Sequence, residues 1–167
     1  MLTLGIDPGS SVTGYGLVES RAGSLRTLGH GAITPPANLQ FLDRLPYIAD
    51  AIERLLRRVE PDGVAIEGVF HSRNSRVALK LGSVRGAALL PVLRARLPVF
   101  EYSPRLVKQA VTGSGAAEKE QVRRMVRLLL RLGEAPLTLD ASDALAVAIC
   151  HAHALPIHSA RENSARA

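Results

Sequence analysis

Two acidic residues stand where a buried strand is expected to end. Asp7 follows the apolar stretch 2–6 and precedes a Pro-Gly turn, and Glu67 follows the apolar run 64–66. A buried strand has little reason to end in a charge unless the charge binds something, because burying an unpaired carboxylate costs several kcal/mol. Each residue can therefore be a metal ligand or a catalytic acid or base, whereas Asp7 alone could simply initiate the turn.

A second pair of acids opens the last predicted helix, which spans 139–150. Asp140 and Asp143 are three residues apart, so they share one helical face with Cβ atoms about 5–6 Å apart. Thr138 precedes them and can cap the helix. Taken alone, this pair fits ordinary helix N-terminal chemistry, since the helix dipole favours acidic side chains there.

Asp7, Glu67, Asp140 and Asp143 together bring four formal negative charges, which match two divalent cations. In two-metal nucleases such carboxylates hold ions about 3.5–4 Å apart, one activating water and the other stabilising the leaving oxygen. The set therefore predicts phosphodiester hydrolysis. A phosphate-binding hairpin of the sugar kinase and actin-like type is the alternative for the opening strand. That class needs two lobes, and the 167 residues contain no second Asp-x-Gly hairpin.

Much of the positive charge is concentrated between Arg105 and Arg131, where there are seven basic residues and two acidic ones. The protein carries a net charge of +6 and has a pI of about 10.2, which suits a polyanionic partner. Lys108 and Lys119 flank the glycine-rich turn 113–115 and are expected to contact phosphates. The nearby arginines form the polar side of a helix, and both a solvated surface and phosphate contact stay open for them: Arg123, Arg124, Arg127 and Arg131.

Three further side chains have alternative interpretations. Phe70 lies in a polar loop after Glu67 and can stack on or wedge between nucleic-acid bases, or pack back onto the sheet. His151 lies eight residues beyond Asp143, about 12 Å along the helix, so we expect it and His153 to have structural or surface roles rather than to bind metal.

The pattern of elements predicts a single α/β domain over residues 1–153 with a disordered tail at 154–167. Strands are expected at 2–7, 14–19, 25–33, 64–67 and 98–102, and helices at 42–59, 75–96, 105–112, near 122–132 and at 139–150. The helix 75–96 is apolar over so much of its circumference that it should pack on the sheet and on a second subunit. Pro91 should kink this helix or end it early.

The sequence also indicates a cytoplasmic location. Cys150 is the only cysteine, so an internal disulfide framework is excluded, which suits a reducing compartment. Asp7 interrupts the N-terminus before an apolar signal core can form, and the longest apolar run, 144–150, is too short to cross a bilayer.

Several segments closely resemble the RuvC family of bacterial Holliday-junction resolvases, from the N-terminus to about His153. The matching segments are Gly-Ile-Asp-Pro-Gly-Ser at 5–10, Ala-Ile-Glu-Gly-Val-Phe at 65–70, Ala-Leu-Lys-Leu-Gly at 78–82, Phe-Glu-Tyr at 100–102, Val-Lys-Gln at 107–109, Ala-Glu-Lys at 117–119 and Asp-Ala-Ser-Asp-Ala-Leu-Ala at 140–146. Pro91 and the residues 71–73 depart from the pattern of the family.

The resemblance implies a ribonuclease H-like fold, a five-stranded mixed sheet flanked by helices on both faces. It implies magnesium-binding catalytic acids, two ions to a site with Mn²⁺ able to substitute, and DNA contacts through an aromatic residue and two lysines. These roles fall on Asp7, Glu67, Asp140 and Asp143 for the acids, and on Phe70, Lys108 and Lys119 for the DNA contacts. It further implies a homodimer that nicks two strands of like polarity in a four-way DNA junction, leaves ligatable ends and works with the RuvA–RuvB branch-migration machinery.

Two other classes share part of this pattern. The ribonuclease H-like nucleases that process pre-16S rRNA have the same opening strand and metal acids but would be shorter, and Phe70 with the lysine pair favours the junction enzyme. A junction-binding subunit without activity would be expected to lack at least one of the acids, and all four are present.

Overall fold

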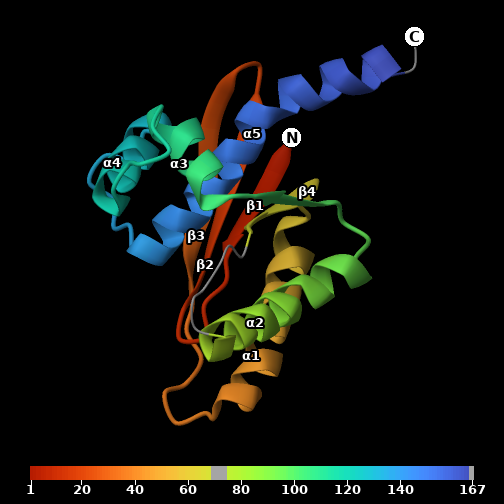
Figure 1. Cartoon of the computed structure of the whole chain (residues 1–167), viewed down its shortest axis with the longest axis vertical. Coiled ribbons are helices and arrows are strands. Elements are labelled where there is room, and N and C mark those ends of the chain that lie inside the picture. The colour runs from red at the N-terminus through yellow and green to blue at the C-terminus, as the bar shows by residue number, and fades with distance from the viewer. Residues whose placement is uncertain (69–74, 166–167) are drawn as a thin grey trace.

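The computed structural model describes residues 1–68 and 75–165, with side chains described through Ala154. Five strands form one mixed sheet in the order β3-β2-β1-β4-β5 (Figure 1). The strand β1 pairs antiparallel with β2 and parallel with β4, and β5 extends the parallel part. The strands are β1 Leu2–Asp7, β2 Thr13–Arg21, β3 Ser24–Ile33, β4 Gly63–Glu67 and β5 Val99–Tyr102.

Helices cover both faces of the sheet, as Figure 1 shows. On one face α1 and α2 enclose a core with the large apolar residues of β1 and β4, such as Ile6 and Ile66. On the other face α5 crosses the sheet, and α3 and α4 pack against α5. The helices are α1 Phe41–Val59, α2 Ser75–Arg94, α3 Pro104–Thr112, α4 Lys119–Leu129 and α5 Leu139–Ala165. The predicted five-stranded mixed sheet with helices on both faces is confirmed.

Glycines in β1 and β2 let α5 lie directly on the sheet. A Cβ atom at Gly14 would stand 2.0 Å from the carbonyl oxygen of Asp140, and one at Gly5 would stand 2.0 Å from that of Ala144. At Gly16 the added atom would meet the side chain of Leu145 at 2.6 Å. Real Cβ atoms do not approach this closely, so any larger residue at these positions would push the helix away from the strands.

The helix α2 differs from the expectation drawn from Pro91. The sequence predicted that Pro91 would kink the helix or end it early; the early end is wrong, because α2 continues through Pro91 to Arg94, and the kink stays a prediction. Pro91 is buried within the last turn, and its carbonyl accepts a hydrogen bond from the backbone N–H of Ala95 at 3.0 Å. Proline has no N–H to donate to the carbonyl of Ala87, so α2 continues through Pro91 without this one backbone hydrogen bond.

The helix α5 also extends further than expected. It continues to Ala165, so helical backbone reaches into the segment 154–167 that the sequence predicted to be disordered. The division into a domain at 1–153 and a separate tail stays a prediction. In the part of the chain that the structure describes, no helix combines the length and the apolar character that a membrane span requires.

Candidate active site

The topology places Asp7 and Glu67 next to each other. The strands β1 and β4 are parallel neighbours, with Ile6 opposite Ile66, and each ends one residue later in its carboxylate. Both side chains therefore leave the same edge of the sheet, as expected from their positions at the ends of two buried strands. This edge lies beside the N-terminal end of α5. Asp7 is paired with Gly14 of β2, and Gly14 lies against the backbone of Asp140 at the start of α5.

The N-terminal end of α5 supplies the other two acids. The hydroxyl of Thr138 accepts a hydrogen bond from the N–H of Ala141 at 3.3 Å, which is the predicted N-terminal cap. Asp140 lies in the first turn and Asp143 follows three residues later, and both side chains raise the pKa of Asp7 through charge repulsion. The helix and the two strands thus bring together four acids that are 136 residues apart at the extremes, Asp7 and Asp143.

The electrostatics of the cluster favour a bound cation. Burial, followed by repulsion from Asp143 and Glu67, raises the pKa of Asp7 from its ordinary value of 3.8 to about 7. Burial and the charge of Asp143 likewise raise the pKa of Glu67. Near neutral pH, part of the Asp7 population therefore keeps its proton until positive charge compensates the cluster.

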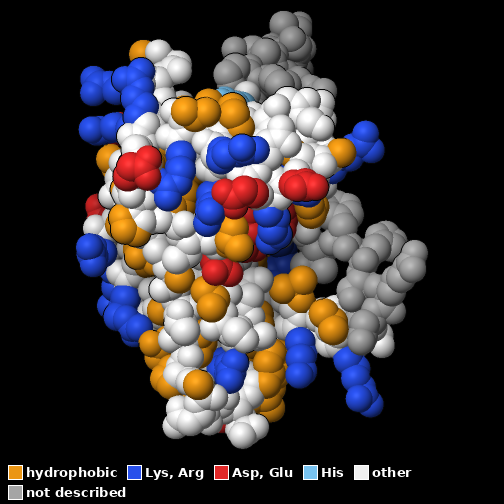
Figure 2. Space-filling view, turned by 90° about the vertical axis from the view of Figure 1, so that its left-hand side faces the viewer, with side chains coloured by type: hydrophobic (Ala, Val, Ile, Leu, Met, Phe, Trp, Pro, Cys, Tyr) orange, Lys and Arg blue, Asp and Glu red, His pale blue; other side chains and the backbone are white. Residues whose placement is uncertain are grey.

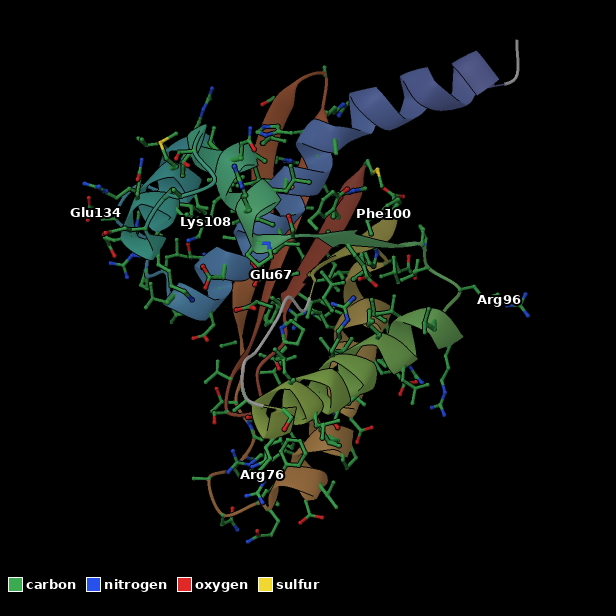
Figure 3. All side chains as sticks on the ribbon, in the orientation of Figure 1. Glu67, Arg76, Arg96, Phe100, Lys108 and Glu134 are labelled. Atoms are coloured by element: carbon green, nitrogen blue, oxygen red, sulfur yellow. The ribbon has the colours of Figure 1, made fainter. Side chains whose placement is uncertain are left out.

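Lys119 supplies positive charge to this cluster in the structure. Its Nζ lies 2.7 Å from Oδ2 of Asp143, and this hydrogen bond together with Asp143, Asp7 and Glu67 raises the pKa of the Lys119 ammonium. The charge of Lys108, on α3, partly offsets the rise in the pKa of Glu67. Figure 3 shows Lys108 and Glu67 together at the end of β4. Both predicted phosphate-binding lysines therefore lie at the edge of the acidic cluster.

The donor set fits hard divalent cations, which prefer carboxylate oxygens. Among the described residues, no three His, Cys, Asp or Glu side chains stand close enough together to hold a metal ion. The ammonium group of Lys119 lies beside Asp143 and neutralises the charge of one of the four acids. The arrangement is that of an acidic cluster balanced by a lysine, with the ligand chemistry that magnesium or manganese requires.

Two of the arginines predicted on the polar side of α4 make contacts within the chain. Arg123 pairs with Glu120 at 3.0 Å, and Arg127 donates hydrogen bonds to the carbonyl oxygens of Gly133 and Ala135. Figure 2, which faces this side of the molecule, shows basic and acidic side chains interspersed. Arg127 in particular stabilises the turn after α4, which accounts for its charge without a phosphate.

The histidines have contacts away from the acids. His151 is fully buried, its Nδ1 lies 2.7 Å from the hydroxyl of Tyr102, and its ring stacks on Phe100 with centroids 4.1 Å apart. Nδ1 of His153 lies 3.1 Å from the carbonyl oxygen of Ala110. The structural role expected of His151 is confirmed. Phe70, the predicted DNA-contacting aromatic, lies outside the described residues.

Two residues near the cluster were missed by the sequence interpretation. Gly14 carries the contact that fixes the height of α5 above the sheet, and Arg85 of α2 hydrogen-bonds the backbone of Glu67. A small residue opposite the start of a helix and an arginine amid apolar neighbours carry no signal by themselves. Each becomes meaningful only once the packing partner is known.

Acids gathered from the ends of two central strands and from a helix laid across them define a class of metal-dependent nuclease built on a ribonuclease H-like sheet. The sequence matches the family model of crossover junction endodeoxyribonuclease RuvC over residues 3–151, and the chain belongs to this family.

The chain is similar to relatives of its own length. It is 47% identical over 165 residues to crossover junction endodeoxyribonuclease RuvC of Syntrophomonas wolfei, covering 99% of this chain and 96% of the relative. It is 50% identical over 156 residues to the protein of the same name from Moorella thermoacetica, covering 93% of each. Among solved structures it is similar to Thermus thermophilus RuvC in complex with a Holliday junction substrate, with a TM-score of 0.84 and 38% identity, covering 91% of this chain and 93% of that one.

Proposed function

We propose that this protein is an endonuclease that resolves four-way DNA junctions by hydrolysing phosphodiester bonds in two strands of like polarity, in recombination and DNA repair. The observation that carries the proposal is the convergence of Asp7, Glu67 and the two α5 acids at one edge of the sheet, in a chain that belongs to the RuvC family. This family membership and the likeness to a structure holding a Holliday junction support the choice of substrate.

The acids Asp7, Glu67, Asp140 and Asp143 would hold two magnesium ions, with manganese as a substitute. When bound, such ions activate water for attack on the phosphorus and stabilise the leaving oxygen. The contribution of the protein is to hold four oxygen-bearing groups on rigid elements. The other three carboxylates all raise the pKa of Asp7, so the cluster gains most from cations when all of its acids are ionised.

Lys108 and Lys119 would bind the phosphates that flank the cleaved bond. An ammonium group is a compact point charge with three donors, so it can follow a phosphate without a fixed orientation. In the structure the ammonium of Lys119 rests on Asp143, with its side chain 68% exposed. A phosphate or a metal ion that enters the cluster would compete for this contact. Phe70 would complete the DNA surface by contacting a base at the junction.

A homodimer is the assembly that suits this substrate, since a four-way junction has approximate two-fold symmetry and two sites related by an axis can address two like strands. The outer side of α2 supports this assembly. Three of its leucines, Leu79, Leu90 and Leu93, are among the exposed large apolar residues of the described chain. They occupy one helical face, because their spacing follows the helical repeat.

Two glycines on the same face of α2 strengthen the case for a second subunit. Gly82 and Gly86 have nothing within 4 Å of the place where a Cβ atom would stand, so the folded chain itself does not require glycine there. Glycine inside a helix costs about 1 kcal/mol relative to alanine. Close approach of another helix would explain this cost. We therefore place the two-fold axis beside α2.

The proposed setting is the cytoplasm, where the dimer would act with the RuvA–RuvB branch-migration machinery. The reducing environment expected from the single, buried Cys150 is compatible with this setting.

A cleavage assay with magnesium tests the proposal. The purified protein is given a mobile four-way DNA junction, a linear duplex of matched sequence and a structured RNA. We expect paired nicks at symmetric positions in the junction only. Cleavage of the RNA with an intact junction would instead indicate an rRNA-processing nuclease, and binding without cleavage of any substrate would indicate a junction-binding subunit.

A further inference from the structure

Arg85 on α2 connects this helix to the ends of two strands of the sheet. Its Nη1 donates a hydrogen bond of 2.6 Å to the backbone carbonyl of Glu67, and its Nη2 lies 2.6 Å from Oε1 of Glu101. Glu67 is the last residue of β4, and Glu101 belongs to the neighbouring β5. One guanidinium group therefore holds two strand ends at the edge where the acids gather.

The carbonyl of Glu67 stands where the pairing of the sheet runs out. The parallel ladder between β1 and β4 ends at the pair of Ile6 with Ile66, so Glu67 is not paired with β1 in this ladder. On the other side, Glu67 is opposite Tyr102, and the N–H of Gly68 donates to the carbonyl of Tyr102 at 2.8 Å. Arg85 thus supplies the donor for a backbone carbonyl at a strand end, where an unpaired group would cost free energy.

The contact has the features of a rigid support. The side chain of Arg85 is only 13% exposed, although that of Glu101 is 61% exposed. A guanidinium presents its donors in a fixed planar fork, so the bonds to Glu67 and to Glu101 constrain each other. A hydrogen bond from a charged donor is also about twice as strong as a neutral one.

We infer that Arg85 is a positioning residue for the reaction, which sets the orientation of Glu67 through its backbone carbonyl and is itself oriented by Glu101. The inference rests on the proposed function only in taking Glu67 as a metal ligand. Arg85 reaches the backbone of Glu67 and not its carboxylate, so it would act through the placement of this ligand. Groups that orient metal ligands typically change metal affinity or activity by about 10–100-fold when removed.

The test compares Mn²⁺ binding by calorimetry, cleavage of a four-way junction under single-turnover conditions and thermal unfolding, for Arg85→Gln, Arg85→Lys and Glu101→Gln. We expect Arg85→Gln to weaken Mn²⁺ binding and to slow cleavage by about tenfold or more. Arg85→Lys should recover part of both, since lysine can reach one of the two partners. Glu101→Gln should have an effect of about two- to threefold, because the bond to the Glu67 carbonyl is kept.

The matched control is Arg57→Gln, which removes an arginine whose Nη2 lies 2.6 Å from Oε1 of Glu53 on the surface of α1. This variant should keep wild-type metal binding and cleavage. Junction affinity without metal should be unchanged in all variants, since Arg85 is not proposed to touch DNA. If Arg85→Gln fails to fold, Arg85→Lys and Glu101→Gln carry the test.

Wild-type Mn²⁺ affinity and wild-type cleavage in Arg85→Lys and Glu101→Gln, together with either the same result or no fold in Arg85→Gln, would overturn the inference. A wild-type protein that cuts no junction would instead contradict the proposed function. The Mn²⁺ measurement would then still decide the role of Arg85, because it does not depend on the substrate.

Discussion

The Nζ atom of Lys119 lies 2.7 Å from Oδ2 of Asp143, so a residue expected to bind DNA contacts a residue expected to bind metal. The charge of the same ammonium partly offsets the rise in the pKa of both Asp7 and Glu67. In this state Lys119 reduces the repulsion among the acids. Metal binding and DNA binding are therefore expected to influence each other at this one side chain.

The first prediction compares Lys108→Ala with Lys119→Ala in junction binding at several salt concentrations. Each lysine that neutralises one phosphate contributes about 0.9 to the slope of log K against log salt concentration. Without metal, Lys108→Ala should reduce the slope by about this amount, whereas Lys119→Ala should reduce it less, because Lys119 is paired with Asp143.

Calcium, which binds carboxylate oxygens, should remove this difference by freeing Lys119 for DNA. Equal slopes for the wild type and both variants, with and without calcium, would move the phosphate contacts elsewhere. Arg124 on α4 would then be the next candidate, since it is exposed.

The second prediction is that Asp7→Asn abolishes cleavage and leaves junction affinity intact or improved. Asp7 lies among acids that repel one another and an incoming phosphate, so loss of one charge should not weaken DNA binding in the absence of metal. Cleavage rates and electrophoretic binding assays measure the two effects separately. Substantial activity of Asp7→Asn at saturating magnesium would contradict a metal role for this residue.

The same variant should be more stable than the wild type in metal-free buffer, by about 4 kcal/mol at pH 8, since each unit of pKa shift corresponds to about 1.4 kcal/mol. The pKa of Asp7 is raised from 3.8 to about 7 in the folded protein, so the free-energy cost of ionising it in the folded state accumulates between pH 4 and pH 7. The stabilising effect of Asp7→Asn should therefore vanish near pH 4, grow up to about pH 7 and stay constant above it. Urea unfolding at pH 4 and at pH 8 measures the difference in stability between the variant and the wild type. An equal difference at the two pH values would argue against a raised pKa.

The third prediction concerns the contact of α5 with the sheet. Gly14→Ala would place a methyl group 2.0 Å from the carbonyl oxygen of Asp140, so α5 must shift and carry its acids with it. We expect a loss of about 1–3 kcal/mol in stability and a loss of cleavage. Gly16→Ala is the matched control, since it meets chiefly the side chain of Leu145. It should be destabilised yet retain more activity than Gly14→Ala at a temperature where both are folded.

The fourth prediction is that Leu79→Asp or Leu93→Asp produces a monomer. Leu79 and Leu93 are 73% and 59% exposed in the isolated chain. An aspartate at either position would be solvated in the monomer but would lose its water in a dimer interface at α2. Sedimentation at tens of micromolar measures the shift. Leu128→Asp on α4, where the leucine is 70% exposed, should stay dimeric.

The apolar pattern of the helix 75–96 does not by itself distinguish these leucines from Leu81 and Leu89. Both of the latter are partly buried, and Leu89 packs on the core beneath α2. Apolar periodicity gives the spacing of the faces of a helix. It does not say which apolar face meets the sheet when the helix is apolar on more than one side.

The candidate site was more accessible to sequence reasoning than the supports around it. Asp7 and Glu67 could be paired because each ends an apolar strand and parallel strands end at one edge of the sheet. The contacts of Gly14 and Arg85 depend on how α5 and α2 lie against that sheet. Such long-range packing is not encoded in any local pattern, so these two residues could not be assigned before the fold was known.

The two ends of the described domain meet in the candidate site, and this has a consequence for synthesis. Asp7 lies on the first strand, whereas Asp140 and Asp143 lie on the last helix. When a growing chain has emerged from the ribosome as far as α4, it contains all five strands of the sheet but only two of the four acids. The proposed metal site therefore cannot assemble until α5 emerges and docks on β1 and β2, so we expect the growing chain not to cut DNA before α5 has been made.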